Sequence, residues 1–436
     1  PVPAMMAVFA QRTGVPYPWG DYRQIFVQRF RYFGMENTGA TINAQSALVG
    51  AHLNGTRPGI ERLVAHELAH QWFGDLLTCR SWQELWLNEG FARFMEAEWF
   101  REAYGPEALA ELVLWWQGRA KGSAPLAGRF HQGPGHPVHG RVYMLGASVL
   151  HGLREMLGED RFWEGIQLYV RRHAHSDVET RDLQRALEDV TGQNLDWYFQ
   201  QWTELAVRPV LTVGATFGDG HVDVHVAQTV DGTHPAFVMP VVVEAKLKSG
   251  DVVRTRGWLE GGSLNLRLDA VEAPTWVAFD PAGGLLADVD LRISSGMLSA
   301  LVLDEQGPPH ARLRAMRALA KDGEADALKA VLERSSAHPA MRREAARGLG
   351  EQAALDALLP SAQDPDNSVR LEVVKALGRC FGPTLGTTLR TVALGDTNPD
   401  VQGAALRGLA NVAPADAVVV INNKVFLQKH TFSWKT

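Results

Sequence analysis

The alternation of apolar and polar residues changes its period twice along the chain. Up to about residue 208 the apolar positions recur with helical spacing, as in residues 60–73. The period then falls to two, as in the runs 222–226 and 241–247, which is typical of strands with one buried face. From about residue 308 helical spacing returns. The pattern therefore predicts a helical part, a small antiparallel β-sandwich and a second helical part.

The second helical part repeats a short motif. A cation, a small residue and a leucine recur four times, and the leucines are 30, 28 and 32 residues apart. This spacing resembles HEAT-type repeats, in which helix pairs stack into a solenoid; an ordinary helical bundle is the alternative. From residue 416 the repeat stops, and we expect an irregular tail to residue 436. The four copies of the motif are residues 317–320, 347–350, 375–378 and 407–410.

Composition excludes several classes of protein. The chain has 436 residues, too many for one ordinary core, so about two to four domains are expected. Its formal net charge of −6 provides no basic footprint, so nucleic acid is not an expected partner. We also expect no membrane span and a soluble protein, because no apolar run is long enough to cross a bilayer.

The compartment in which the protein works is addressed by its two cysteines and by its first residues. Cys79 and Cys380 lie in different predicted parts, which excludes a disulfide framework. This usage favours a reducing, cytoplasmic compartment, and a cysteine-poor secreted enzyme is the alternative. The sequence opens with Pro1 and has no signal segment, so we expect a fragment or processed form and leave the compartment open.

One motif carries the chemistry. His66-Glu67-Leu68-Ala69-His70 lies in the predicted helix 60–73, and helical geometry places two histidines four residues apart on one face. Glu89, nineteen residues later in a second helical pattern, supplies a third ligand. Two histidines and one carboxylate on Zn²⁺ leave a position open for water, as in hydrolytic zinc sites. Glu67 lies beside the ion as a general base, so the pattern predicts a zinc hydrolase.

Four stretches together match one known family: His66–Asp75 with Trp86–Ala92, the motif Gly34-Met35-Glu36-Asn37, the segment Tyr143–Leu150, and residues 182–202. They resemble the gluzincin aminopeptidases, the family of aminopeptidase N and the leukotriene hydrolase, in which the second stretch is the exopeptidase motif. The resemblance implies a multi-domain α+β chain with a thermolysin-like, mainly helical catalytic domain over residues 1–208. A β-sandwich over 209–294, HEAT-like repeats over 295–415 and the tail over 416–436 would follow.

The resemblance also assigns roles. It implies that Glu36, with Gly34 and Met35, binds the substrate's free α-ammonium group, and that Tyr143 stabilises the oxyanion. From the residues alone, an exposed acid at Glu36 and a core or surface aromatic at Tyr143 are the favoured interpretations. Two departures are that Phe33 replaces the family's usual small residue and that the family's N-terminal β-domain has no counterpart here.

Two further features have competing interpretations. Glu96 lies two helical turns after Glu89 and is either an outer partner of a zinc histidine or a solvated helix acid. His131, His136 and His139 precede Tyr143 in a Gly- and Pro-rich stretch, where a surface loop is favoured over a second metal site.

The sequence therefore predicts a zinc aminopeptidase that binds one Zn²⁺ and acts on peptides with a free N-terminus. An endopeptidase or epoxide-opening enzyme on the same scaffold is one alternative. Another is a catalytically weak scaffold of the same family that binds a protein partner through its helical repeats; this chain, however, keeps all three zinc ligands and the base. Preferred residue and oligomeric state are not predicted.

Overall fold

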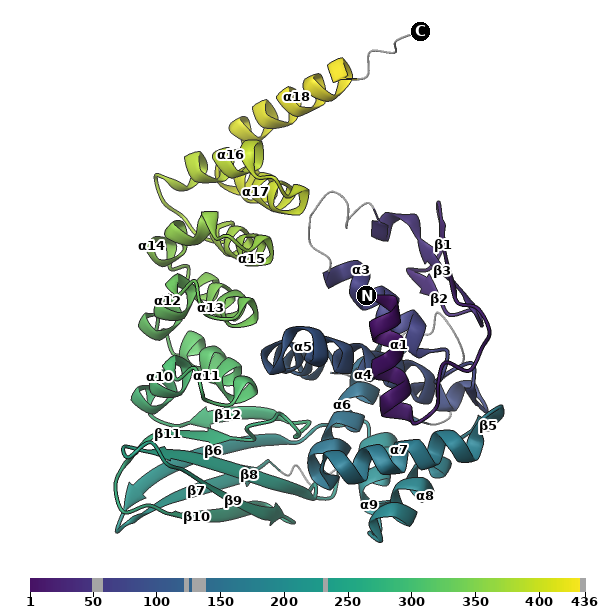
Figure 1. Ribbon diagram of the computed structural model, residues 1–436. Helices are drawn as coiled ribbons and strands as arrows, with labels where there is room; N and C mark the ends of the chain where they lie inside the picture. The colour runs from purple at the N-terminus through teal and green to yellow at the C-terminus, as the bar shows by residue number, and fades with distance from the viewer. Residues whose placement is uncertain (49–57, 121–124, 128–138, 230–233, 432–436) are drawn as a thin grey trace. The chain divides into compact units, whose positions relative to one another are not determined.

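The computed structural model describes residues 1–48, 58–120, 125–127, 139–229 and 234–431 (Figure 1). It combines helices and sheets, in agreement with the mixed fold class that the sequence predicted. The chain forms two compact units. The first contains Pro1–Leu48, Pro58–Met297 and Gly307–Arg312, and the second contains Leu298–Gln306 and the chain from Leu313 onward.

Helix α4 (Trp86–Tyr104) is the centre of the helical part of the first unit. It is buried on nearly every face, so neighbours must cover it on all sides. Gly90 and Gly146 allow α4 and α6 to approach closely, because a Cβ on Gly90 would lie 2.9 Å from the Cα of Gly146. The other helices are α1 (Val2–Thr13), α3 (Pro58–Ala69), α5 (Pro106–Arg119), α6 (His139–Leu157), α7 (Glu159–His173), α8 (Thr180–Thr191) and α9 (Asp196–Phe199).

A small sheet lies beside α3. Its strand order is β1 (Arg23–Val27), β3 (Ala40–Ala44), β2 (Gly34–Met35), and β2 pairs antiparallel with β3 over only two residues. Gly39, at φ 71°, makes the turn between β2 and β3. A second pair, β4 (Leu77–Cys79) and β5 (Ser176–Val178), runs parallel. The short strand β2 therefore carries the predicted exopeptidase motif on a sheet edge.

The period-two region forms two sheets, both within the first unit. Their orders are β10-β7-β6-β12 and β11-β8-β9. Alternate valines of β7 and β8 are buried, as the sequence pattern predicted. One expectation was wrong: β12 pairs parallel with β6, because the chain arrives from the other sheet and enters this edge in the direction of β6. The strands are β6 (Val210–Gly218), β7 (His221–Gln228), β8 (Met239–Leu247), β9 (Val252–Leu259), β10 (Ser263–Asp269), β11 (Pro274–Phe279) and β12 (Asp288–Arg292).

Paired helices make up the second unit. Polar side chains cap two of its helices: Asp366 accepts from the N–H of Ser368 at 2.8 Å, and Asn398 accepts from that of Asp400 at 2.8 Å. The four repeated leucines are fully buried. The helices from the junction onward are α10 (Ser295–Leu303), α11 (Pro309–Lys321), α12 (Asp326–Glu333), α13 (Pro339–Glu351), α14 (Leu355–Leu358), α15 (Asn367–Leu377), α16 (Leu385–Gly395), α17 (Pro399–Val412) and α18 (Pro414–Thr431).

The irregular tail expected from residue 416 was wrong over most of its length. Helix α18 runs from Pro414 to Thr431. Its valine run has the β-branched composition of a strand, but Pro414 at the first turn starts a helix, and Ala417 and Val420 are buried three residues apart. Among the described residues, no helix is long and apolar enough to cross a membrane.

Candidate metal centre and active site

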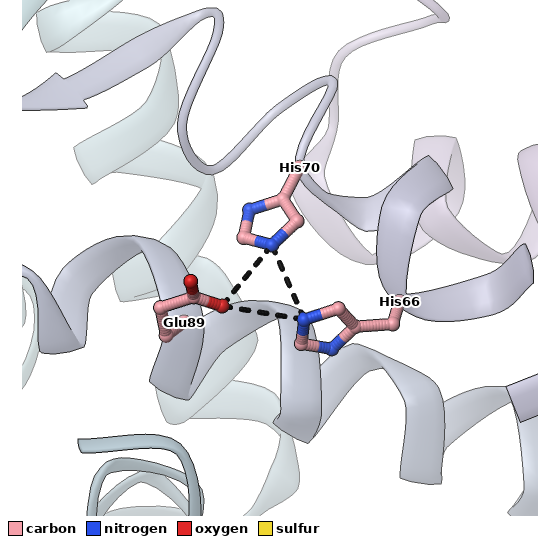
Figure 2. Close-up of side chains that lie close together, drawn as sticks. All are labelled: His66, His70 and Glu89. Carbon is pink, nitrogen blue, oxygen red and sulfur yellow. Dashed lines mark hydrogen bonds and ion pairs between the residues drawn. The ribbon is translucent and has the colours of Figure 1, made fainter. Parts of the chain in front are cut away.

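The three predicted zinc ligands converge on one point. His66 lies in the last turn of α3, His70 follows that helix, and Glu89 lies in the first turn of α4. The two histidine Nε2 atoms are 3.3 Å apart, and each lies 3.3 Å from Oε2 of Glu89 (Figure 2). All three side chains are buried. The ligand atoms therefore form an equilateral triangle inside the protein.

The size and chemistry of this triangle fit a zinc ion. Zinc binds nitrogen and oxygen tetrahedrally at about 2.0–2.1 Å, which places two ligand atoms about 3.3 Å apart. Nδ1 of His70 lies 2.9 Å from the carbonyl oxygen of Phe73. Because a carbonyl only accepts, Nδ1 of His70 donates to it, and Nε2 faces the other two ligand atoms. Nitrogen and oxygen atoms that face one another in a buried site need a positive charge between them.

The centre carries an excess of negative charge. Burial alone would lower the pKa of His70, but the carboxylates of Glu36, Glu89 and Glu67 together raise it to about 10. Burial lowers the pKa of His66, as does the positive charge of Arg93. Burial alone would raise the pKa of Glu89, whereas hydrogen bonds to the two histidines hold it well below its usual range. The centre thus favours a bound positive charge.

Glu67 faces the same centre from α3. Burial, and the nearby carboxylates of Glu36 and Glu89, raise its pKa to about 8. Its carboxylate lies directly against the backbone of β2: a Cβ on Gly34 would overlap Oε1 of Glu67. Gly34 is therefore the residue that lets the edge strand pass the predicted base without a steric clash.

Glu36 follows β2 and reaches this cluster. Carboxylate oxygens of Glu36 and Glu67 and a ring nitrogen of His70 all lie within 4.8 Å of one another. Glu36 is half-buried. Gly34 and Met35 pair with Asn43 and Ile42 of β3, which fixes the strand that leads to Glu36. The structure thus brings the exopeptidase motif to the metal ligands, although the two are about thirty residues apart in sequence.

Tyr143 reaches the centre from α6. Its hydroxyl donates to Oε1 of Glu89 at 2.5 Å, and its ring stacks on His66 with centroids 5.8 Å apart. Burial and the charge of Glu89 raise its pKa far above the usual value, so the hydroxyl keeps its proton. Arg93 lies over the ring at 5.8 Å from its centroid. Tyr143 is therefore a neutral hydrogen-bond donor beside the metal ligands.

Glu96 is fully buried, so its interpretation as a solvated acid was wrong. It accepts from Nε of Arg62 at 2.5 Å and from Arg93. One of its oxygens lies 4.0 Å from Nδ1 of His66, the ring atom that points away from the predicted metal. Sequence reasoning missed Arg62, since a lone arginine on a helix gives no signal until its partner helix is known. It also missed Arg93, which lies three residues before Glu96 on the same helix.

The histidine-rich stretch cannot be placed. His131 and His136 lie outside the described residues, and so does the side chain of His139, the first residue of α6. Cys79 and Cys380 are free thiols, in agreement with the predicted absence of a disulfide framework.

Known proteins resemble the chain in two regions. Residues 2–202 match the peptidase family M1 domain, and residues 326–410 match HEAT repeats. Aminopeptidase N of Streptomyces lividans is 35% identical over 217 residues, which are 45% of this chain and 24% of that protein. Aminopeptidase 2 of Candida albicans is 27% identical over 341 residues, which are 66% of this chain and 36% of that protein. The matched part of the chain therefore spans about a third or less of these curated relatives.

A solved structure shares the fold. The crystal structure of Legionella pneumophila aminopeptidase A in complex with aspartic acid superposes with a TM-score of 0.79, at 16% identity. The match covers 97% of this chain and 57% of that one. At this identity the likeness concerns the fold alone.

Proposed function

Because the chain belongs to the gluzincin aminopeptidases of peptidase family M1, we propose that it is a zinc-dependent aminopeptidase. It would hydrolyse the first peptide bond of peptides that have a free N-terminus. One observation carries the proposal: three buried ligand atoms lie 3.3 Å apart, the spacing of a tetrahedral zinc site, with two further carboxylates beside them. Family membership alone would not require that geometry.

The residues of the centre have complementary roles in this proposal. His66, His70 and Glu89 hold the zinc ion, which when bound acidifies a water molecule and polarises the substrate carbonyl. Glu67 takes a proton from the attacking water at its carboxylate and passes it to the leaving amine. Its raised pKa suits both steps, because a base with a pKa near the working pH can also act as an acid.

Two further groups select and stabilise the substrate. Glu36 pairs with the α-ammonium group, a charge that acetylated or internal residues do not offer. Tyr143 donates a hydrogen bond to the oxyanion once its hydroxyl turns from Oε1 of Glu89, the acceptor that it has in the structure and that keeps it beside the centre. Both roles combine the resemblance to the family with the positions of the side chains.

Our proposed architecture keeps the domain boundaries 1–208, 209–294 and 295–415. It consists of a thermolysin-like catalytic domain, a β-sandwich and a solenoid of repeats. The exposed face of the repeats is proposed as a surface for a protein partner. The catalytically weak scaffold is not favoured, because the three ligands and the base are present and lie together.

The test compares two buried glutamates of α3 in the full chain. We expect Glu67→Gln to abolish hydrolysis of aminoacyl-coumarins and leave the zinc content at one ion per chain. Glu61 is also buried, and its two carboxylate oxygens accept hydrogen bonds from Trp99 and Tyr104. A glutamine there can accept from Trp99 with its oxygen and donate to the hydroxyl of Tyr104 with its amide. Glu61→Gln is therefore the matched control and should retain activity. Equal activity in wild type and Glu67→Gln would refute the proposal.

A further inference from the structure

Gln71 follows the second histidine of the metal motif and is fully buried. Every hydrogen-bonding position of its side-chain amide is used. Nε2 donates to the carbonyl oxygen of Glu36 at 3.0 Å and to Oδ2 of Asp75 at 2.8 Å. Oε1 accepts from the N–H of Gly39 at 2.8 Å and from the hydroxyl of Tyr17 at 3.2 Å. A buried amide with four partners is held in one orientation.

Its partners make this orientation unambiguous. The main-chain N–H of Gly39 can only donate, and the main-chain carbonyl of Glu36 can only accept. Rotating the amide by half a turn would set two donors against each other on one side and two acceptors on the other. In this orientation the amide therefore binds one acceptor and one donor of the loop that carries Glu36.

This loop has little other support from its own sheet. Strand β2 pairs with β3 over only two residues. Two main-chain bonds of 2.9 Å hold the turn that follows, one from the N–H of Ala40 to the carbonyl of Asn37 and one from the N–H of Arg23 to the carbonyl of Gly39. Gln71 fixes the loop at Glu36 and again at Gly39. Since Gln71 is adjacent to His70, both hydrogen bonds fix the position of the loop relative to the metal ligands.

We propose that Gln71 is a positioning residue for recognition of the substrate's free amine. Its amide holds the Glu36 carboxylate at a fixed place relative to His66, His70 and Glu89, so an α-ammonium group and the scissile carbonyl are bound together. The inference rests on the proposed function, because it needs Glu36 to bind the amine. Gln71 itself does not touch the substrate.

Gln71→Glu removes both donors and keeps the shape. A carboxylate would then face the carbonyl oxygen of Glu36 and the carboxylate of Asp75, so the loop is pushed away from the metal ligands. We expect the affinity that the free amine contributes to fall about tenfold to a hundredfold, the usual effect of a lost hydrogen bond to a charged group. Binding at the metal itself should not change.

Two inhibitors separate these effects in the full, zinc-loaded chain. An aminoacyl hydroxamate and its des-amino analogue both bind zinc, and only the first offers an ammonium group. The ratio of their dissociation constants, measured by calorimetry, reports amine recognition without any catalytic step. Zinc content and thermal unfolding are measured for each variant.

Gln228 supplies the matched control. It is buried in β7, donates to the carbonyls of Phe237 and Gly261 at 3.0 and 2.8 Å, and accepts from the N–H of Phe237 at 2.9 Å. Gln228→Glu therefore makes the same chemical change to a buried amide that also bonds main-chain groups, but in a sheet outside the centre. We expect it to lower stability and leave the hydroxamate ratio unchanged.

The outcomes are distinct. A large ratio in wild type that falls at least tenfold in Gln71→Glu, with unchanged affinity for the des-amino compound, supports the inference. A large ratio that Gln71→Glu retains overturns it and leaves the proposed function intact. A ratio near one in wild type contradicts amine recognition by Glu36 and hence the proposed function. If Gln71→Glu does not fold, Gln71→Met, which keeps the volume and removes all four bonds, is read by the same criteria.

Discussion

Of the three buried glutamates of helix α4, Glu89 and Glu98 have opposite surroundings. Glu98 is neutralised by the protein itself: Arg154 donates to it, and Nε of Arg12 lies 3.3 Å away. Glu89 meets two imidazole nitrogens and a tyrosine hydroxyl, and among the described residues no lysine or arginine forms an ion pair with it. A buried carboxylate needs a compensating charge. Glu98 obtains it from the chain, whereas Glu89 is arranged to share a cation from solution.

The largest effect is expected from a substitution of Glu89. We expect Glu89→Ala to remove one of three ligands, so that bound zinc is lost and hydrolysis falls by about a thousandfold or more. The folded state should survive, since the remaining histidines can stay neutral. Zinc analysis of the dialysed protein and initial rates with aminoacyl-coumarins check this. A variant with full zinc and full activity would show that Glu89 is not a ligand.

Glu98→Gln should affect stability instead. Removing the charge of Glu98 leaves the buried Arg154 with only the more exposed carboxylates of Glu155 and Glu159, and costs up to about 3–5 kcal/mol. For a unit of this size that lowers the midpoint of thermal unfolding by roughly 10 °C. Zinc content and activity of the folded protein should stay near wild type. Unchanged unfolding with reduced zinc binding would reverse the roles assigned to the two glutamates.

Tyr143→Phe keeps the ring and removes the hydroxyl. If the hydroxyl stabilises the oxyanion, kcat should fall by about a hundredfold to a thousandfold, since loss of one such donor costs roughly 3–4 kcal/mol of transition-state binding. KM and zinc content should change little. A change confined to KM would place Tyr143 in substrate binding only.

The ionic cluster around Glu98 also predicts a dependence of stability on pH. His151 accepts from Arg154 at 2.9 Å and lies 3.0 Å from the carbonyl of Ala282, so it is buried as a neutral ring. Burial and the charge of Arg154 lower its pKa to about 3.

The unfolded chain binds a proton at His151 below about pH 6.5, and the folded chain does not until about pH 3. This contribution to stability is thus complete above pH 6.5 and is lost as pH falls, by about 1.4 kcal/mol per pH unit. His151→Gln keeps a donor and an acceptor, and should show a shallower loss of stability between pH 6.5 and 4 in denaturant titrations. Parallel curves for the two proteins would contradict the assignment.

Local patterns in the sequence predicted the ligands of the centre and the helical repeats. The spacing of His66 and His70 and the caps at Asp366 and Asn398 depend only on neighbours along the chain. Contacts between distant segments were not predictable. Gln71 contacts main-chain groups 32 and 35 residues upstream, and Glu96 needs Arg62 from another helix. Strand β12 pairs parallel with β6 after the chain crosses over from the other sheet. Helix α18 was missed because its valines suit strands as well as helices.

Zinc K-edge absorption spectroscopy of the full chain tests the central claim most directly. The account predicts one zinc ion per chain with ligands at about 2.0–2.1 Å that include two imidazoles, and loss of that signal in Glu89→Ala but not in Glu98→Gln. A zinc environment without two imidazoles, or one that Glu89→Ala leaves unchanged, would contradict it.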